Sequence, residues 1–246
     1  AGAKGRREIA GARRGEHARR IADAGPAHFV DHPRQRGRLI GTDGGDMLFG
    51  KTIVVTGVAS GIGRRTAELA GQLGAEVIGV DVNAPDRPLG HFVAGDISTP
   101  DGVARVADAM PGQLDALCNV AGVSGRSGAA ATLAVNFFGL RALSERLAPK
   151  IREGGCLVNV ASIAGYGWRA NLERARAIAS TQGFPDPATI AGEFDVPDGA
   201  CYPISKEILI VWTMMAAHLE RFRSRGIRVN SVSPGPVETP ILSQFR

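Results

Sequence analysis

The sequence has few cysteines and histidines, and no apolar segment long enough to cross a membrane. Its three cysteines, Cys118, Cys156 and Cys201, are odd in number and show no framework spacing. We therefore expect no disulfide scaffold and a reducing, cytoplasmic location. The five histidines form no cluster with metal-ligand spacing, so we predict no metal site. The longest apolar run, near residues 208–217, is too short to span a bilayer and is typical of a buried helix face.

The net charge of +5 is concentrated near the N-terminus. Residues 1–46 contain ten Lys and Arg against six Asp and Glu, whereas residues 47–246 contain nineteen against eighteen. The larger part is nearly neutral and lacks the charge signature of a nucleic-acid-binding protein. Residues 1–46 have no apolar periodicity and no secretory core, which predicts a disordered basic extension. Met47 directly precedes residues 48–51, which lead into the first predicted strand, so we hypothesise that it is the natural start. A functional arm that binds RNA is the alternative.

A glycine-rich turn follows the first predicted strand. Residues 52–56 (TIVVT) form a β-branched run without alternation, which is typical of a buried parallel strand. The sequence T-G-V-A-S-G-I-G occupies residues 56–63, and residues 64–73 have helical periodicity. This order predicts a dinucleotide site, because glycines allow a tight turn and close approach of the backbone to pyrophosphate. The helix N-terminus adds free N–H groups and a positive partial charge.

An acidic residue ends the second predicted strand. Asp81 follows residues 76–80 and lies eighteen residues after Gly63, near the spacing of the carboxylate that binds the adenosine ribose. A carboxylate there accepts hydrogen bonds from both ribose hydroxyls and repels a 2′-phosphate, which predicts NAD rather than NADP. A simple turn residue is the structural alternative for Asp81. Arg64 and Arg65 are expected to face pyrophosphate or solvent rather than a 2′-phosphate.

Tyr202 and Lys206 lie four residues apart, so on a helix they share one face. An ammonium placed there favours the phenolate, and such a tyrosine can exchange a proton with an alcohol or a carbonyl. Many helices carry this pair by chance, so the pair is a weak signal alone. The dinucleotide site predicted upstream makes it a strong one.

With these two features, residues 48–246 resemble the short-chain dehydrogenase/reductase family. T-G-x-x-x-G-I-G combined with a downstream Y-x-x-x-K is specific, and further family marks follow in order. These marks are Asp96-Ile97 after the third predicted strand (91–94), N-V-A-G at 119–122 where the family has N-N-A-G, Asn136 on a helix, Ser162 ending the fifth strand (156–161), and P-G at 234–235 after the sixth (227–233).

The resemblance implies a catalytic set and a cofactor site. The catalytic set is Asn136, Ser162, Tyr202 and Lys206. The implied cofactor contacts, besides Tyr202 and Lys206, are Gly57, Ser60, Gly61, Ile62, Gly63, Asp81, Asp96, Ile97, Asn119, Ala121, Gly122, Pro234, Gly235, Val237 and Thr239. Taken singly, Asn119, Asn136 and Ser162 each have a structural alternative.

The implied activity is NAD-dependent hydride transfer between an alcohol and its carbonyl. In this interpretation Tyr202 is the acid or base and Ser162 donates a hydrogen bond to the substrate oxygen. Lys206 also holds the nicotinamide ribose, and Asn136 holds a water that links Lys206 to solvent. Two alternatives stay open: a non-catalytic nucleotide-binding protein, and another reaction on the same fold, such as that of an epimerase or dehydratase.

The expected fold is α/β, a Rossmann-type doubly wound parallel sheet with helices on both faces. The family's last strand has no sequence here, so the chain is either a fragment or a departure from its relatives. An uncovered sixth strand would be a pairing edge, which predicts reduced stability. Relatives associate through two long helices, here near residues 132–151 and 202–225, so we expect a homodimer or homotetramer.

The segment between Ser162 and Tyr202 has 39 residues, many more than is common in the family. This insert (residues 163–201) includes a predicted amphipathic helix at 168–180, and its position suggests a substrate lid. A surface or oligomer-contact element is the alternative. The long insert resembles the branch that contains 3α-hydroxysteroid dehydrogenase/carbonyl reductase and coniferyl-alcohol dehydrogenase. That branch implies a small hydrophobic substrate, a steroid-like or coniferyl-alcohol-like secondary or allylic alcohol.

Overall fold

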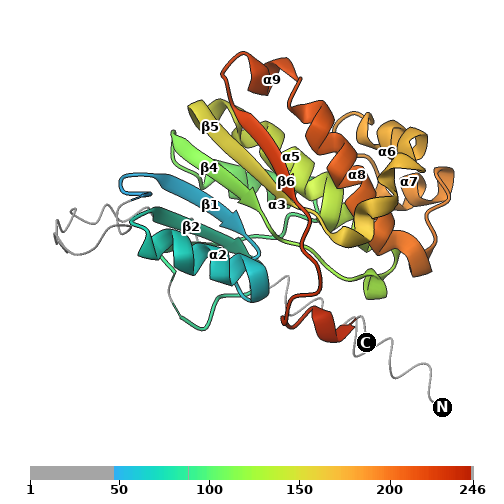
Figure 1. Ribbon diagram of the computed structural model, residues 1–246, viewed down its shortest axis with the longest axis horizontal. Coiled ribbons are helices and arrows are strands. Elements are labelled where there is room, and N and C mark those ends of the chain that lie inside the picture. Colours follow the sequence, from blue (N-terminus) through green and yellow to red (C-terminus); the bar gives the residue numbers. More distant parts are fainter. Residues whose placement is uncertain (1–46, 88, 245–246) are drawn as a thin grey trace. The chain divides into compact units, whose positions relative to one another are not determined.

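Six parallel strands form one sheet in the order β3-β2-β1-β4-β5-β6 (Figure 1). The computed structural model describes residues 47–87 and 89–244, and the predicted extension 1–46 lies outside them. The strands are β1 (Thr52–Thr56), β2 (Glu76–Asp81), β3 (His91–Ala94), β4 (Leu114–Asn119), β5 (Ile151–Val160) and β6 (Arg228–Val232). Since the order runs outward from β1 in both directions, the predicted doubly wound α/β fold is confirmed.

Helices cover both faces of the sheet. They are α2 (Gly61–Gln72), α3 (Pro100–Asp108), α4 (Ala129–Leu133), α5 (Leu140–Leu147), α6 (Leu172–Ala179), α7 (Pro187–Glu193), α8 (Cys201–Ala216) and α9 (Glu220–Arg223). Successive strand residues point to opposite faces, so β1 contributes to two apolar cores. Ile53 and Val55 join the core under α2, and Val54 joins the larger core under α3, α5 and α8. None of the described helices has both the length and the apolar content needed to cross a bilayer.

The two long predicted helices are interrupted. The first is divided into α4, a π-helical turn η2 (Ala134–Gly139) and α5. A Cβ on Gly139 would lie 2.1 Å from the carbonyl oxygen of Ile97, so a glycine here lets the wide turn approach the loop after β3. The second ends at Ala216, and the short α9 follows. Hydrophobic periodicity does not reveal a π-helical turn, because the residues on either side keep the helical pattern.

Two further boundaries differ from the predictions. β5 begins at Ile151 rather than at the predicted residue 156. Gly154 and Gly155 are typical of a turn, but here they lie inside the strand, where its register with β4 shifts. Gly154 has φ of +68°, which suits a glycine. Helix α2 begins at Gly61, three residues before the predicted start, so the last glycines of the turn belong to its first turn.

The insert folds into two short α-helices, α6 and α7, and two 3₁₀ segments, η4 (Ile163–Arg169) and η5 (Asp198–Ala200). Trp168 belongs to η4 rather than to the predicted amphipathic helix, which is α6. Helix α7 has Pro187 in its first turn, and the Asp186 side chain accepts a hydrogen bond from the Thr189 amide at 2.9 Å. Segments η4 and α6 pack on α8, and α7 packs on α4. Self-association of the chain stays a prediction.

Candidate active site

A cleft of about 930 Å³ lies at the carboxyl ends of the strands. It extends to both sides of the point between β1 and β4, where the strand order reverses. Its walls come from the loops after β1, β2, β3, β4, β5 and β6 and from the first turns of α8. All the predicted site residues line this cleft except Asn119 and Asn136. The chain therefore brings together side chains that the sequence separates by up to about 180 positions.

The glycine-rich turn forms one wall of the cleft. Gly57 and Gly61 have φ of +78° and +57°, which favours glycine. A Cβ on Gly63 would lie 2.1 Å from the carbonyl oxygen of Gly57, so the start of α2 and the turn touch through their backbones. Ser60 precedes α2 and its side chain makes no capping hydrogen bond. The first residues of α2 line the cleft and their N–H groups are not capped by this side chain, a favourable arrangement for phosphate.

Asp81 lies at the end of β2, directly beside this turn. Its Oδ2 accepts a hydrogen bond from the Ala59 amide and its Oδ1 from the Asn83 amide, both at 3.0 Å. The carboxylate is thereby fixed between the glycine turn and the β2 loop. Arg64 and Arg65 both pair with Glu68 at 3.1 Å, so these guanidinium groups are held by a carboxylate of their own helix.

Asn119 does not reach the cleft, contrary to the prediction. It is fully buried, and its Nδ2 donates to Ser144 Oγ at 2.8 Å and to Asn159 Oδ1 at 2.9 Å. It joins β4 to β5 and α5 beneath the site, because β4 places alternate side chains on its buried face. Sequence reasoning also missed Thr56, whose Oγ1 accepts from the amides of Val120 and Ala121 at 2.9 and 3.0 Å. Thr56 thereby fixes the loop after β4.

Tyr202 and Lys206 lie in the first turns of α8. Lys206 is buried, its Nζ lies 5.7 Å from the centre of the Tyr202 ring, and it donates to the Val160 carbonyl at 3.0 Å. Burial lowers the pKa of Lys206 from 10.5 to about 8. The ammonium is still the main form of Lys206 at neutral pH. It lies close enough to the Tyr202 ring to favour the phenolate electrostatically.

Asn136 lies behind Gly122, next to Lys206. A Cβ on Gly122 would lie 3.2 Å from Asn136 Oδ1 and 3.6 Å from Lys206 Nζ, so the two side chains approach one point. Asn136 Oδ1 accepts from the Val123 amide at 2.8 Å, and its Nδ2 donates to the Val123 carbonyl at 3.0 Å and to Ser205 Oγ at 3.1 Å. The fully buried amide therefore fixes the loop after β4 from below.

Ser162 lies at the end of β5 and lines the cleft beside α8. Its Oγ accepts a hydrogen bond from the Ala164 amide at 3.1 Å, so Ser162 is the N-cap of η4. A hydroxyl has one proton and two lone pairs, so its proton is still available to donate to a substrate oxygen.

The far end of the cleft holds residues that the sequence did not reveal. Ser124 Oγ donates to Gln244 Oε1 at 2.5 Å, and Arg126 Nε donates to the Gln244 carbonyl at 2.8 Å. Asp198 Oδ1 accepts from the Ala129 amide at 2.7 Å. These partners are about 70 to 120 positions apart, so only the fold brings them together.

Comparison with known proteins agrees with this geometry. The family model for short chain dehydrogenase matches residues 51–172. The chain is 41% identical over 198 residues to coniferyl-alcohol dehydrogenase of Pseudomonas sp. strain HR199, covering 80% of this chain and 77% of that protein. The chain belongs to the short-chain dehydrogenase family. This short-chain dehydrogenase is an oxidoreductase, and the expected branch is confirmed.

Solved structures are also similar to this short-chain dehydrogenase, including two that are complexed with NADH. One is 3-alpha-hydroxysteroid dehydrogenase from Pseudomonas sp. B-0831 complexed with NADH, with a TM-score of 0.64, 33% identity and coverage of 78% of this chain and 75% of that one. The other is 3-ketoacyl-(acyl-carrier-protein) reductase from Brucella melitensis complexed with NADH, with a TM-score of 0.57, 25% identity and 79% coverage of both chains.

The buried lysine leads to a prediction on stability. Between pH 8 and 10.5 the unfolded chain binds the Lys206 proton that the folded chain has lost, so the stability contributed by this group rises with pH. Relative to Lys206→Met, wild type should gain about 3 kcal/mol of unfolding free energy from neutral pH to pH about 10.5. Chemical denaturation of both proteins at several pH values measures the change. The lost hydrogen bond to Val160 is a constant offset, and a pH-independent difference would contradict the prediction.

Proposed function

We propose that this short-chain dehydrogenase uses NAD to interconvert a hydrophobic secondary or allylic alcohol and its carbonyl. The observation that carries the proposal is one cleft lined by the glycine turn, Asp81, Ser162, Tyr202 and Lys206. A binding protein needs the first two features, but it has no use for a phenol, a buried ammonium and a hydroxyl gathered at the other end of the same cleft.

The wall of the cleft suits a dinucleotide. The backbone approaches itself closely at Gly63, and Gly57 and Gly61 have positive φ angles. These glycines leave a space along the turn that larger side chains would fill. The N-terminus of α2 would hold the pyrophosphate and Asp81 the adenosine ribose, while Lys206 would hold the nicotinamide ribose. When bound, the nicotinamide supplies the hydride chemistry.

The polar side chains at the other end would handle the proton. In alcohol oxidation the Tyr202 phenolate oxygen takes the proton of the substrate hydroxyl, and in carbonyl reduction the neutral Tyr202 hydroxyl donates its proton to the substrate oxygen. The Lys206 ammonium stabilises the phenolate electrostatically. The Ser162 hydroxyl donates to the substrate oxygen, where negative charge develops. Asn136, next to Lys206, is proposed to hold the water that exchanges protons with solvent.

The substrate class rests on the relatives and on the lining of the cleft. Two of the three relatives named above, at 41% and 33% identity, are dehydrogenases of coniferyl alcohol and of a 3-alpha-hydroxysteroid, both bulky and largely apolar alcohols. The end of the cleft beside Tyr202 includes Ile163, Pro203 and Leu242, which suit an apolar ring.

An absorbance screen tests the proposal. The full chain is mixed with NAD or NADP and with cinnamyl-type, steroid and small cyclic alcohols, and the near-ultraviolet absorbance of reduced nicotinamide is followed. Turnover should be fastest with NAD and a bulky apolar alcohol. Tight NAD binding by calorimetry without turnover of any alcohol or matching carbonyl would overturn the proposed reaction and favour a nucleotide-binding protein.

Asp81 should set the preference for NAD over NADP. In Asp81→Asn the single amide oxygen can still accept a hydrogen bond from one of the two loop amides, and the uncharged side chain no longer repels a 2′-phosphate. The ratio of kcat/KM for NAD to that for NADP should fall by about tenfold or more, because like charges in contact cost several kcal/mol. Asp101→Asn, an exposed residue in the first turn of α3, is the control. An unchanged ratio in Asp81→Asn would exclude this role.

A further inference from the structure

Most of the insert lies away from the mouth of the cleft. Within the described residues, only Ile163, Ala164, Asp198 and Gly199 of the insert line the cleft, and they come from its two ends. Helices α6 and α7 contribute no lining residue and pack instead on α8 and α4. The central part of the insert therefore calls for a role other than direct contact with substrate.

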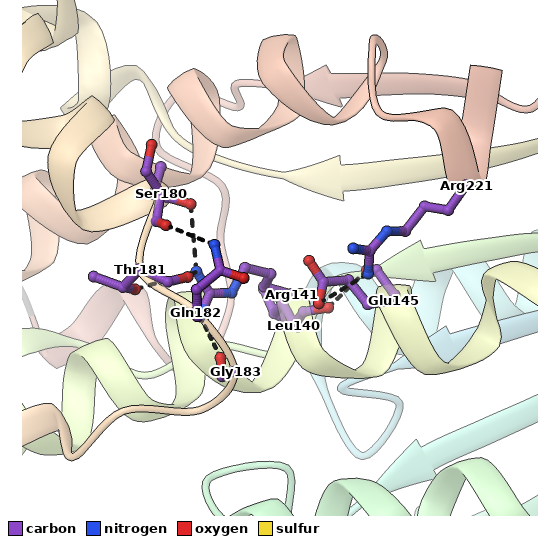
Figure 2. Close-up of polar contacts among 10 residues, drawn as sticks. Leu140, Arg141, Glu145, Ser180, Thr181, Gln182, Gly183 and Arg221 are labelled. Carbon is purple, nitrogen blue, oxygen red and sulfur yellow. Dashed lines mark hydrogen bonds and ion pairs between the residues drawn. The ribbon is translucent and has the colours of Figure 1, made fainter.

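Arg141 of α5 holds the middle of the insert. The residue is 2% exposed, and its guanidinium points from α5 into the turn that follows α6 (Figure 2). Nη1 donates to the carbonyls of Ala179 at 3.3 Å and Thr181 at 2.7 Å, and Nη2 donates to the carbonyl of Gly183. A cation that binds the last carbonyls of a helix also interacts favourably with the helix dipole.

The same guanidinium contacts the turn that carries Asn136. Its central carbon lies 5.2 Å from the centre of the Phe137 ring and 5.3 Å from that of Phe138, and both rings belong to η2. Within the described residues Arg141 has no carboxylate partner within salt-bridge distance, and burial lowers its pKa. One turn along α5, Glu145 pairs instead with Arg221 of α9 at 3.2 Å (Figure 2). A buried cation held by backbone carbonyls, by the Thr181 hydroxyl at 3.3 Å and by two rings joins the insert to η2.

A second attachment joins the insert to α8 next to Lys206. The Glu207 side chain is 7% exposed, and its two oxygens accept from Asn171 Nδ2 at 3.0 and 3.1 Å. Arg174 of α6 lies 3.8 Å from the same carboxylate. A Cβ on Gly165 would lie 2.9 Å from the Lys206 carbonyl carbon, so the backbone of η4 rests directly on that turn of α8.

We propose that the insert is a fixed clamp between the Asn136 turn and the Lys206 turn, and that Arg141 and Glu207 are positioning residues for the proton-handling set. The inference rests on the proposed function, because it assigns the insert to the geometry of that set. The two turns belong to different helices, and Asn136 meets α8 through its 3.1 Å hydrogen bond to Ser205. Small displacements of proton-handling groups strongly reduce the rate of the reaction. A rigid clamp across both helices would therefore raise kcat by holding these groups in place.

Three variants of the full chain test the clamp: Arg141→Met, Arg141→Lys and Glu207→Gln. The controls Arg176→Met and Glu173→Gln change exposed residues of α6. The clamp predicts that Arg141→Met and Glu207→Gln lower kcat by about tenfold to a hundredfold, with the NAD dissociation constant unchanged. Arg141→Lys, which keeps the cation, should recover part of the loss, and the controls should behave as wild type.

Hydrogen exchange gives a readout that does not depend on turnover. In both affected variants exchange should rise in peptides 133–139 and 203–210, as well as in 172–185. A rise confined to 172–185 with kcat unchanged would overturn the clamp. If Arg141→Met does not fold, Arg141→Lys and Glu207→Gln decide the outcome. If wild type turns over no alcohol, the proposed function fails, and exchange in peptides 133–139 and 203–210 alone supports or overturns the clamp.

Discussion

Tyr202→Phe is expected to lower kcat for alcohol oxidation by about a thousandfold while leaving the affinity for NAD largely intact. The change removes one oxygen at the start of α8 and keeps the ring that lies 5.7 Å from Lys206 Nζ. Positioned acid–base groups typically contribute about a hundredfold to ten-thousandfold to a rate, and no second phenol lies in the cleft. Steady-state kinetics and calorimetric titration with NAD measure the two quantities separately.

The chain offers a matched control for this change. Tyr166 is the only other tyrosine in the sequence, and it is 85% exposed on η4. Tyr166→Phe removes the same atom outside the cleft, so kcat should equal that of wild type. Retained turnover in Tyr202→Phe would exclude the proposed base. A loss of NAD affinity parallel to the loss of turnover would show instead that the phenol serves mainly to bind the cofactor.

Local patterns in the sequence predict the framework of the site. The apolar run of β1 and the glycines after it can be interpreted from residues that are close in the sequence. The structure has strand, turn and helix there in the predicted order. Tyr202 and Lys206 share a face because α8 is helical at both positions. Asp81 follows from the same logic, since it ends the strand that pairs with β1.

The remaining features depend on contacts between distant segments. Asn119 matches its motif, yet the alternation of β4 turns it into the core beside Asn159. Arg141 resembles a solvent-facing helix residue in the sequence, and its partners at 179–183 are about 40 positions away. The insert could be predicted as an additional element, but its attachment to both α5 and α8 depends on tertiary packing that periodicity does not encode.

Gly63→Ala is expected to damage both the fold and NAD binding. The new methyl group would meet the carbonyl oxygen of Gly57 at 2.1 Å and its carbonyl carbon at 2.7 Å, and neither backbone atom can rotate away. Overpacking of this kind costs about 1–3 kcal/mol of unfolding free energy. A displaced turn would also lose one or two phosphate-facing N–H bonds, which lowers NAD affinity by about tenfold to a hundredfold. Denaturant titration and calorimetry measure the two effects.

Gly71→Ala, in the same helix, should have the opposite effect on stability. A Cβ on Gly71 would meet no atom within 4 Å, and its φ is not in the positive range. Alanine is the better helix former, so the variant should gain about 0.5–1 kcal/mol and bind NAD as wild type does. The two substitutions add the same methyl group to the same helix, so the helix propensity of alanine cannot explain a loss at Gly63. If Gly63→Ala were as stable and bound NAD as tightly as Gly71→Ala, the cleft wall would not depend on backbone contact at the glycine turn, and the cofactor site would have to lie elsewhere.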